Sequence, residues 1–213
     1  MSQPNNTSLA KLLATENLTV QQSNVSTASF DVKNRVLTLP IWATEDKFVE
    51  DHMTGHEVGH ALYTPLDGWH DAVCSKGASF KSYLNVVEDA RIEKLIQRKY
   101  PGLRGSFIKS YRKLLADGFF GADLATINQM GLIDRINTYF KCGTSSGVRF
   151  EADEKVWLDR IANAETWKQV VQITEDLFAF AKEKAEQEQA EQSQESSEDD
   201  DDQQDFGEDG DSS

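Results

Sequence analysis

Two histidines separated by three residues constrain this chain more than any other feature. His56 and His60 lie in the segment 54–65, which reads Thr-Gly-His-Glu-Val-Gly-His-Ala-Leu-Tyr-Thr-Pro. Residues i and i+4 of an α-helix lie on one face, about one turn apart. Both imidazoles can then bind the same metal ion. The spacing therefore predicts a helix, and a fold that brings a third ligand to its histidine face.

Glu57 completes the pattern H-E-x-x-H. On a helix this pattern is typical of zinc peptidases, in which the histidines bind Zn²⁺ and the glutamate acts as general base. Thr44 is an N-cap type, and Glu45 and Asp46 place negative charge in the first turn. Pro65 predicts the end of the helix.

A glycine directly precedes each histidine of the motif. Gly55 and Gly59 each cost about 1 kcal/mol relative to alanine inside a helix. We therefore expect another backbone or a substrate to pass close to them. His52 lies one turn before His56 on the same face, and we expect it to pack or to lie at the surface rather than to bind metal.

The third ligand is expected on a second helix, from about Ser82 to Tyr100. At 100° per residue, Glu88 stands in the middle of its apolar face, Asp89 lies on the edge, and Glu93 faces away. A carboxylate in a core is costly unless it is paired or binds a metal. We expect Glu88, 28 residues after His60, to be the third zinc ligand. The alternative is a buried ion pair with Arg91 on the same face.

Three short segments near the N-terminus favour β-strands. A short helix over 8–15 is followed by predicted strands over 17–22, 28–32 and 35–39, the last two joined by a turn at Lys33-Asn34 as a hairpin. The segment 37–42 directly precedes the metal helix, so it is the candidate edge strand on which a peptide backbone could pair. Ordinary core strands are the alternative.

The remaining body is predicted to be helical. Residues 66–80 form a polar, glycine-containing connection, in which His70 could stabilise an oxyanion or simply be exposed. Amphipathic helices are expected over 107–115, 124–140, 153–162 and 167–181. The fold class is therefore α+β and mostly helical. A single domain over 1–182 comprises a small sheet and the metal helix (1–65), followed by a helical part (66–182).

Negative charge is concentrated in residues 183–213. They contain 14 Asp or Glu and one Lys, a net charge of -13, against -14 for the whole chain. This composition predicts a disordered acidic tail, which could dock on a protein partner. Nucleic acid is not an expected partner of this chain. Cys74 and Cys142 suggest no disulfide framework, and no apolar run approaches a membrane span. We expect a cytoplasmic protein that does not bind membranes.

The motif followed by a helical glutamate resembles the gluzincin branch of zinc peptidases. Those enzymes usually carry an aspartate four residues after the third ligand, which orients a ligand histidine. The corresponding position after Glu88 is Ile92. Asp89 or Asn85 are the expected substitutes in this second layer around the metal.

A wider resemblance covers nearly the whole body. The strings at 27–31, 34–40, 55–65, 85–93 and 99–103 are similar to metallopeptidases encoded by large tailed phages. They are also similar to the part of cobaltochelatase subunit CobT that precedes its acidic linker and von Willebrand A domain. The resemblance implies a zincin-like fold and, for a phage-encoded protein, a place in the host cytoplasm.

Together these features predict a zinc-dependent hydrolase of peptide bonds. His56, His60 and Glu88 would bind Zn²⁺, and Glu57 would take the proton of the attacking water. His70, Arg91 and Tyr100 are the candidates for stabilising the oxyanion. The alternative function is a zinc-binding, CobT-like interaction module that acts with a ring ATPase or a von Willebrand A protein, without proteolysis.

Overall fold

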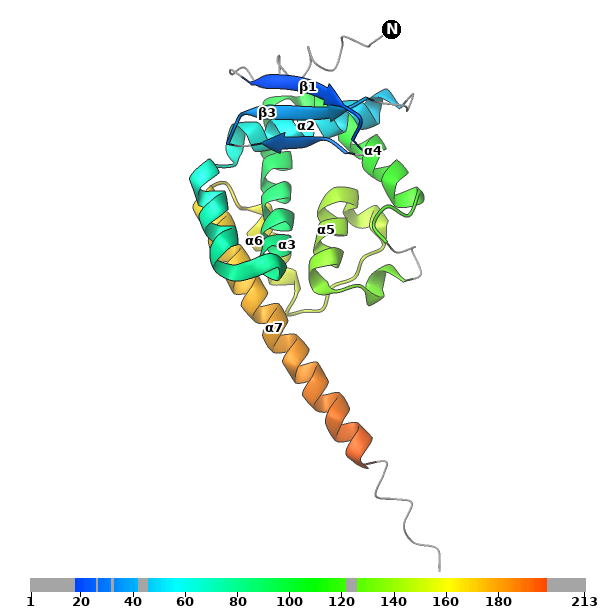
Figure 1. Cartoon of the computed structure of the whole chain (residues 1–213). Coiled ribbons are helices and arrows are strands. Elements are labelled where there is room, and N and C mark those ends of the chain that lie inside the picture. The colour runs from blue at the N-terminus through cyan, green and yellow to red at the C-terminus, as the bar shows by residue number, and fades with distance from the viewer. Residues whose placement is uncertain (1–17, 26, 32, 42–45, 122–125, 199–213) are drawn as a thin grey trace, which may run out of the picture.

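The computed structural model describes residues 18–25, 27–31, 33–41, 46–121 and 126–198. They form an α+β arrangement that is mostly helical, with one three-stranded sheet, which confirms the predicted class. Figure 1 shows the sheet lying across helix α2 (Lys47–Tyr63) at one end of the molecule, with most of the later helices on the other side of α2. The helix predicted over 8–15 lies outside the described residues.

The sheet contains β1 (Thr19–Ser23), β2 (Ser29–Asp31) and β3 (Val36–Pro40), in the order β1-β3-β2. β2 and β3 form the predicted antiparallel hairpin, and β1 pairs parallel with β3. The expectation that 37–42 includes an edge strand is therefore wrong, because β3 is central. Leu37 and Leu39 are fully buried there, and burial on this scale favours the central position. β2 is left as an edge strand.

Helix α2 (Lys47–Tyr63) carries the histidine motif, and the chain leaves it through Thr64 before Pro65. The predicted helix is thus confirmed, while Thr44 and Glu45 lie outside the described residues. The glycines of α2 do lie at close approaches, but mostly to side chains and not to the expected backbone or substrate. A Cβ on Gly59 would lie 2.9 Å from Ile92 Cδ1. The approach comes mainly from side chains of neighbouring helices rather than from a bare backbone.

Helix α3 (Leu66–Lys99) is longer than predicted. The segment 66–80, expected to be a connection, is mostly helical. A break at Gly77, with φ 84° and ψ -178°, separates its first turns from the rest, and glycine tolerates that conformation without steric cost. Trp69 packs against Trp167, with ring centroids 6.0 Å apart. This contact gives the polar segment an apolar anchor that composition alone does not reveal.

The rest of the described chain, over 101–121 and 126–198, consists of short 3₁₀ turns and four helices. The turns are Pro101–Leu103, Ile127–Gln129 and Gly143–Ser146, and the helices are α4 (Arg104–Ala116), α5 (Leu132–Cys142), α6 (Lys155–Ala162) and α7 (Trp167–Glu198). The helix predicted over 124–140 begins only at Leu132, directly after Gly131.

Two apolar clusters hold the elements together. One joins the sheet to α2, α4 and the end of α3, and the other joins the middle of α3 to α5, α6 and α7. Figure 1 shows α3 running between these groups of helices. Helix α3 is therefore covered on more than one side, and this burial decides which of its acidic residues meet the histidines.

Helix α7 continues well past residue 182, to Glu198. The prediction that the disordered tail begins at 183 is therefore wrong for 183–198, while 199–213 lie outside the described residues. Glu, Gln, Ala and Lys are strong helix formers, and Lys184 anchors the start of this segment through ion pairs with Glu151, Asp153 and Glu154. Among the described helices, none is both long and apolar enough to cross a membrane.

Candidate metal centre

Helices α2 and α3 bring three side chains of metal-ligand type together. Asp89 Oδ1 lies 3.2 Å from His60 Nε2 and 3.7 Å from His56 Nε2. The three ligand atoms lie within 4.8 Å of one another, and the side chains are 17–18% exposed. Two imidazoles and one carboxylate are a donor set that suits divalent transition metals. We call His56, His60 and Asp89 the primary group; it could hold a metal ion.

Glu93 sets the orientation of His56. Its Oε1 lies 2.9 Å from His56 Nδ1. The bond to His56 helps to hold the pKa of Glu93 below its usual range, against the effect of burial, so Glu93 is an ionised acceptor. His56 must therefore donate through Nδ1–H, which leaves Nε2 facing Asp89. Carboxylates commonly hold metal-binding histidines in this way.

A relay of hydrogen bonds orients His60. The Thr64 hydroxyl donates to Glu88 Oε1 over 2.5 Å, and Thr64 Oγ1 lies 3.0 Å from His60 Nδ1. Because the single hydroxyl hydrogen is used on Glu88, Thr64 must accept from His60 Nδ1–H. The Nε2 atom of His60 is then available for a metal, as it is for His56.

The carboxylate that meets the histidines is that of Asp89, so the expectation for Glu88 is corrected. Glu88 is fully buried and accepts hydrogen bonds from Arg91 Nε at 2.8 Å and Nη2 at 2.7 Å. Within the described chain it belongs to neither group that could hold a metal. The alternative of a buried ion pair therefore holds. Glu88 acts on the primary group only through Thr64 and His60.

The position of Asp89 beside the histidines also changes how the spacing along α3 is interpreted. The position four residues after Asp89 is Glu93, not Ile92, so an acidic residue stands where the gluzincin pattern places its orienting aspartate. The helical wheel placed Glu93 facing away from the core, yet it is only 6% exposed. Sequence reasoning missed it because it assigned one buried face to α3. The i, i+4 spacing of Asp89 and Glu93 was the available signal.

Lys141 from α5 supplies a cation behind the primary group. Its Nζ lies 3.0 Å from Asp89 Oδ2. Burial would raise the pKa of Asp89, but Lys141, His56 and His60 hold it well below its usual range. Burial likewise would lower the pKa of His56, but Asp89 and then Glu93 raise it to about 9. Without metal, a proton on His56 Nε2 therefore occupies the place that a metal ion would take.

Glu57 lies between two cavities that border the primary group. The strand-side cavity, of about 380 Å³, is bounded by edge strand β2, by Glu57 and His60, and by Asn85. The aromatic cavity, of about 130 Å³, is bounded by Glu57 and His56 together with Tyr111, Phe119 and Phe120. Ala28, just before β2, borders both. Glu57 can thus reach a molecule that lies along β2.

The other predicted site residues are dispersed. Asn85 is exposed and borders the strand-side cavity. His70 is exposed, with Cys74 as a neighbour at 3.6 Å. Arg91 is committed to Glu88, and Tyr100 lies at the end of α3. Of these four residues, only Asn85 borders either cavity beside Glu57 in the described part of the chain.

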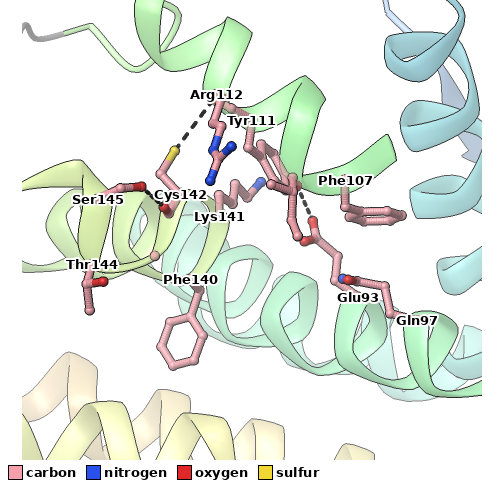
Figure 2. A pocket seen from close by; sticks show the side chains of 12 residues that line it. Glu93, Gln97, Phe107, Tyr111, Arg112, Phe140, Lys141, Cys142, Thr144 and Ser145 are labelled. Carbon is pink, nitrogen blue, oxygen red and sulfur yellow. Dashed lines mark hydrogen bonds between the residues drawn. The ribbon is translucent and has the colours of Figure 1, made fainter. Parts of the chain in front are cut away.

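A third cavity, of about 430 Å³, lies behind the primary group. Figure 2 shows Lys141 reaching from α5 toward Tyr111 and Glu93, with Cys142, Thr144 and Ser145 on the opposite wall. Tyr111 and Lys141 border both this rear cavity and the aromatic cavity. Burial raises the pKa of Cys142 to about 11, so its thiol stays protonated at neutral pH and offers no nucleophile.

Comparison with known proteins gave no match to a family model, to a curated protein or to a solved structure.

Proposed function

We propose that this chain is a zinc-dependent peptidase with a zincin-like fold, in which His56, His60 and Asp89 bind Zn²⁺. One observation carries the proposal. Both imidazoles donate through Nδ1 and present Nε2 to one carboxylate, and Glu57 borders a cavity with each of them. Three protein ligands leave a coordination position open, as in catalytic rather than structural zinc sites.

The chemistry follows from the placement of Glu57. Zn²⁺, when bound, polarises a substrate carbonyl and lowers the pKa of a water to about 7. Glu57 accepts a proton from the attacking water and then donates a proton to the leaving amine. Asn85 and Lys81 border the strand-side cavity and Lys141 borders the aromatic cavity, and these three side chains are the candidate donors for negative charge on the carbonyl oxygen.

The edge strand supports a peptide as the substrate. β2 pairs on one side with β3, which leaves its other edge without a strand partner among the described elements. Ser29 and Phe30 of this strand border the strand-side cavity together with Glu57. An extended peptide could add to this edge through main-chain hydrogen bonds. Its scissile carbonyl would then lie over the primary group.

The test combines zinc analysis with the variant Glu57→Gln. We expect the purified wild-type chain to contain one equivalent of zinc and to cleave a mixture of unstructured peptides, with new termini identified by mass spectrometry. Glu57→Gln should keep the zinc and lose at least about 100-fold in cleavage rate. Asp51→Asn, on the same helix but outside the cavities, is the matched control and should retain both properties.

Two outcomes would contradict the peptidase. One is a zinc-loaded wild-type chain that produces no new termini, and the other is a Glu57→Gln variant that cleaves as fast as the wild type. Either outcome would favour the second candidate, a zinc-binding interaction module.

That second candidate has one observation of its own. The acidic end of α7 extends away from the body (Figure 1), where it is open to a partner. Replacing the acidic residues over 186–198 with glutamine, while keeping Lys184, should abolish partner capture by such a module. The same replacement should leave peptide cleavage by a peptidase unchanged.

A further inference from the structure

A second cluster of ligand-type side chains lies one helical turn along from the primary group. His52, His56 and Glu93 each place a ligand atom within 4.8 Å of the other two. His52 precedes His56 by four residues on α2, and Glu93 follows Asp89 by four residues on α3. The second cluster therefore repeats the primary group with a shift of one turn, and His56 belongs to both.

His52 is the part of this cluster that packing alone leaves unexplained. It is 4% exposed and lies against the rings of Phe107 and Tyr111, with centroids 4.5 and 4.3 Å away. Its Nδ1 lies 2.8 Å from Ser110 Oγ, but its Nε2 has no hydrogen-bond partner among the described residues. A buried polar atom without a partner is destabilising, and a ligand at Nε2 would remove that cost.

The position of His52 suits metal binding. Its Nδ1 has Ser110 as a partner, while its buried Nε2 has none among the described residues, so Nε2 can offer a lone pair to an ion. His52 also borders the aromatic cavity together with His56, so that cavity gives a route for an ion and room for water as a further ligand.

The His56 ring faces both clusters. Its Nδ1 bonds to Glu93, which belongs to the second cluster, while its Nε2 faces Asp89 in the primary group. One nitrogen is thus directed at each. Tyr111 also donates a hydrogen bond to Glu93, so the Glu93 carboxylate is held where the two helices meet.

We propose that His52, His56 and Glu93 form a second site for a divalent transition metal, adjacent to the primary group and sharing the His56 ring with it. The second ion takes the place of the Nδ1 hydrogen that His56 now donates to Glu93, and that proton leaves to solvent. Because the proton must be displaced and Lys141 places a positive charge nearby, the second ion binds at least about tenfold more weakly than the first. Imidazole and carboxylate ligands suit Zn²⁺ and Co²⁺.

The test is titration of the metal-free, full-length chain with Co²⁺, followed by visible absorption and calorimetry. We expect the wild type to take up two equivalents in two steps. His52→Gln and His52→Phe should each take up the first equivalent with an affinity within about threefold of the wild type, and should lose the second. The phenylalanine variant preserves an aromatic ring against Phe107 and Tyr111. Loss of the second equivalent in this variant therefore cannot be attributed to lost packing.

The acidic segment 183–213 is identical in all three chains, so metal taken up by its carboxylates would add equally to each titration and cancels in the comparison. Two results would overturn the second site: a wild type that takes up one equivalent, or His52 variants that keep the second equivalent with unchanged affinity. Glu57→Gln should also take up two equivalents. Metal stoichiometry therefore stands apart from peptide cleavage, and failure of the second site is distinguishable from failure of the peptidase.

Discussion

His56 Nδ1 donates to Glu93 Oε1 over 2.9 Å, and Glu93 stands one turn of α3 beyond Asp89. This bond holds His56 in the tautomer that presents Nε2 to the primary group. Loss of such a partner typically weakens metal binding by about 10–100-fold. We therefore expect Glu93→Gln to weaken the first equivalent of Zn²⁺ by about that factor, measured by competition with a chromophoric chelator.

The matched control for Glu93 is Gln97→Ala, one turn further along α3. Gln97 borders the rear cavity and not the cavities beside Glu57, so its removal should leave zinc affinity within about twofold. Equal affinities in Glu93→Gln and wild type would show that the negative charge of Glu93 does not contribute to zinc binding.

Asp89 and Glu88 are neighbours in sequence with different expected effects on zinc binding. Asp89→Asn should weaken zinc binding by more than about 100-fold, beyond the range of an orienting residue, and should also lower the free energy of unfolding of the metal-free chain, because Lys141 loses its ion-pair partner. Glu88→Gln should weaken zinc by about tenfold or less, because Glu88 acts only through Thr64. It should lower the free energy of unfolding by about 3–5 kcal/mol, because the charge of Arg91 is left buried without its partner.

Urea unfolding and zinc competition on the two variants measure both quantities. The reverse ordering, with zinc lost in Glu88→Gln and kept in Asp89→Asn, would restore Glu88 as the ligand and contradict the primary group.

Glu154 makes stability depend on pH in acid. It is 1% exposed and accepts hydrogen bonds from Arg135 at 2.8 and 2.7 Å and from Lys184 at 3.1 Å. Burial would raise its pKa, but Arg135, the Glu151 amide and Lys184 lower it from 4.5 to about 2. A lowered pKa in the folded state contributes stability above the ordinary value, and this contribution is lost as pH falls from 4.5 toward 2.

We expect Glu154→Gln to lower the free energy of unfolding by about 3 kcal/mol at pH 7, with the difference shrinking between pH 4.5 and 2. Urea unfolding at several pH values measures it. The exposed Glu183→Gln is the control and should change stability by less than about 0.5 kcal/mol throughout. A difference for Glu154→Gln that stays constant down to pH 2 would rule out the charge as its cause.

Gly68 of α3 lies closely against the indole ring of Trp167 in α7. A Cβ there would lie 2.3 Å from Trp167 Nε1 and 3.0 Å from its Cδ1. We expect Gly68→Ala to lower the free energy of unfolding by about 1–3 kcal/mol through overpacking, despite the better helix propensity of alanine. Thermal and urea unfolding measure the change.

Gly105→Ala makes the same substitution at a position where we expect it to raise the free energy of unfolding. In the described structure nothing lies within 4 Å of a Cβ built on this helical glycine, so alanine should stabilise by up to about 1 kcal/mol. Similar effects at both glycines would show that propensity, rather than the Trp167 contact, decides the result at Gly68.

The sequence by itself determined the helices and strands that depend on interactions between residues close together in the chain. The spacing of His56 and His60 requires a helix if both are to bind one ion, and Pro65 follows the end of α2 as expected. The hairpin of β2 and β3 follows from strand-type residues around a short turn. The amphipathic segments after residue 100 also form helices, because the helical spacing of their apolar residues is a local property of the sequence.

The tertiary structure alone decided which residues complete the site. A helical wheel finds one apolar face, but α3 is packed by α2 and by several later helices, so a residue on the polar side, Glu93, is buried as well. Glu88 does occupy the apolar face, yet Arg91 and Thr64 satisfy its charge there. Whether a buried carboxylate meets a cationic side chain or a pair of histidines depends on contacts between distant segments, which no local pattern encodes.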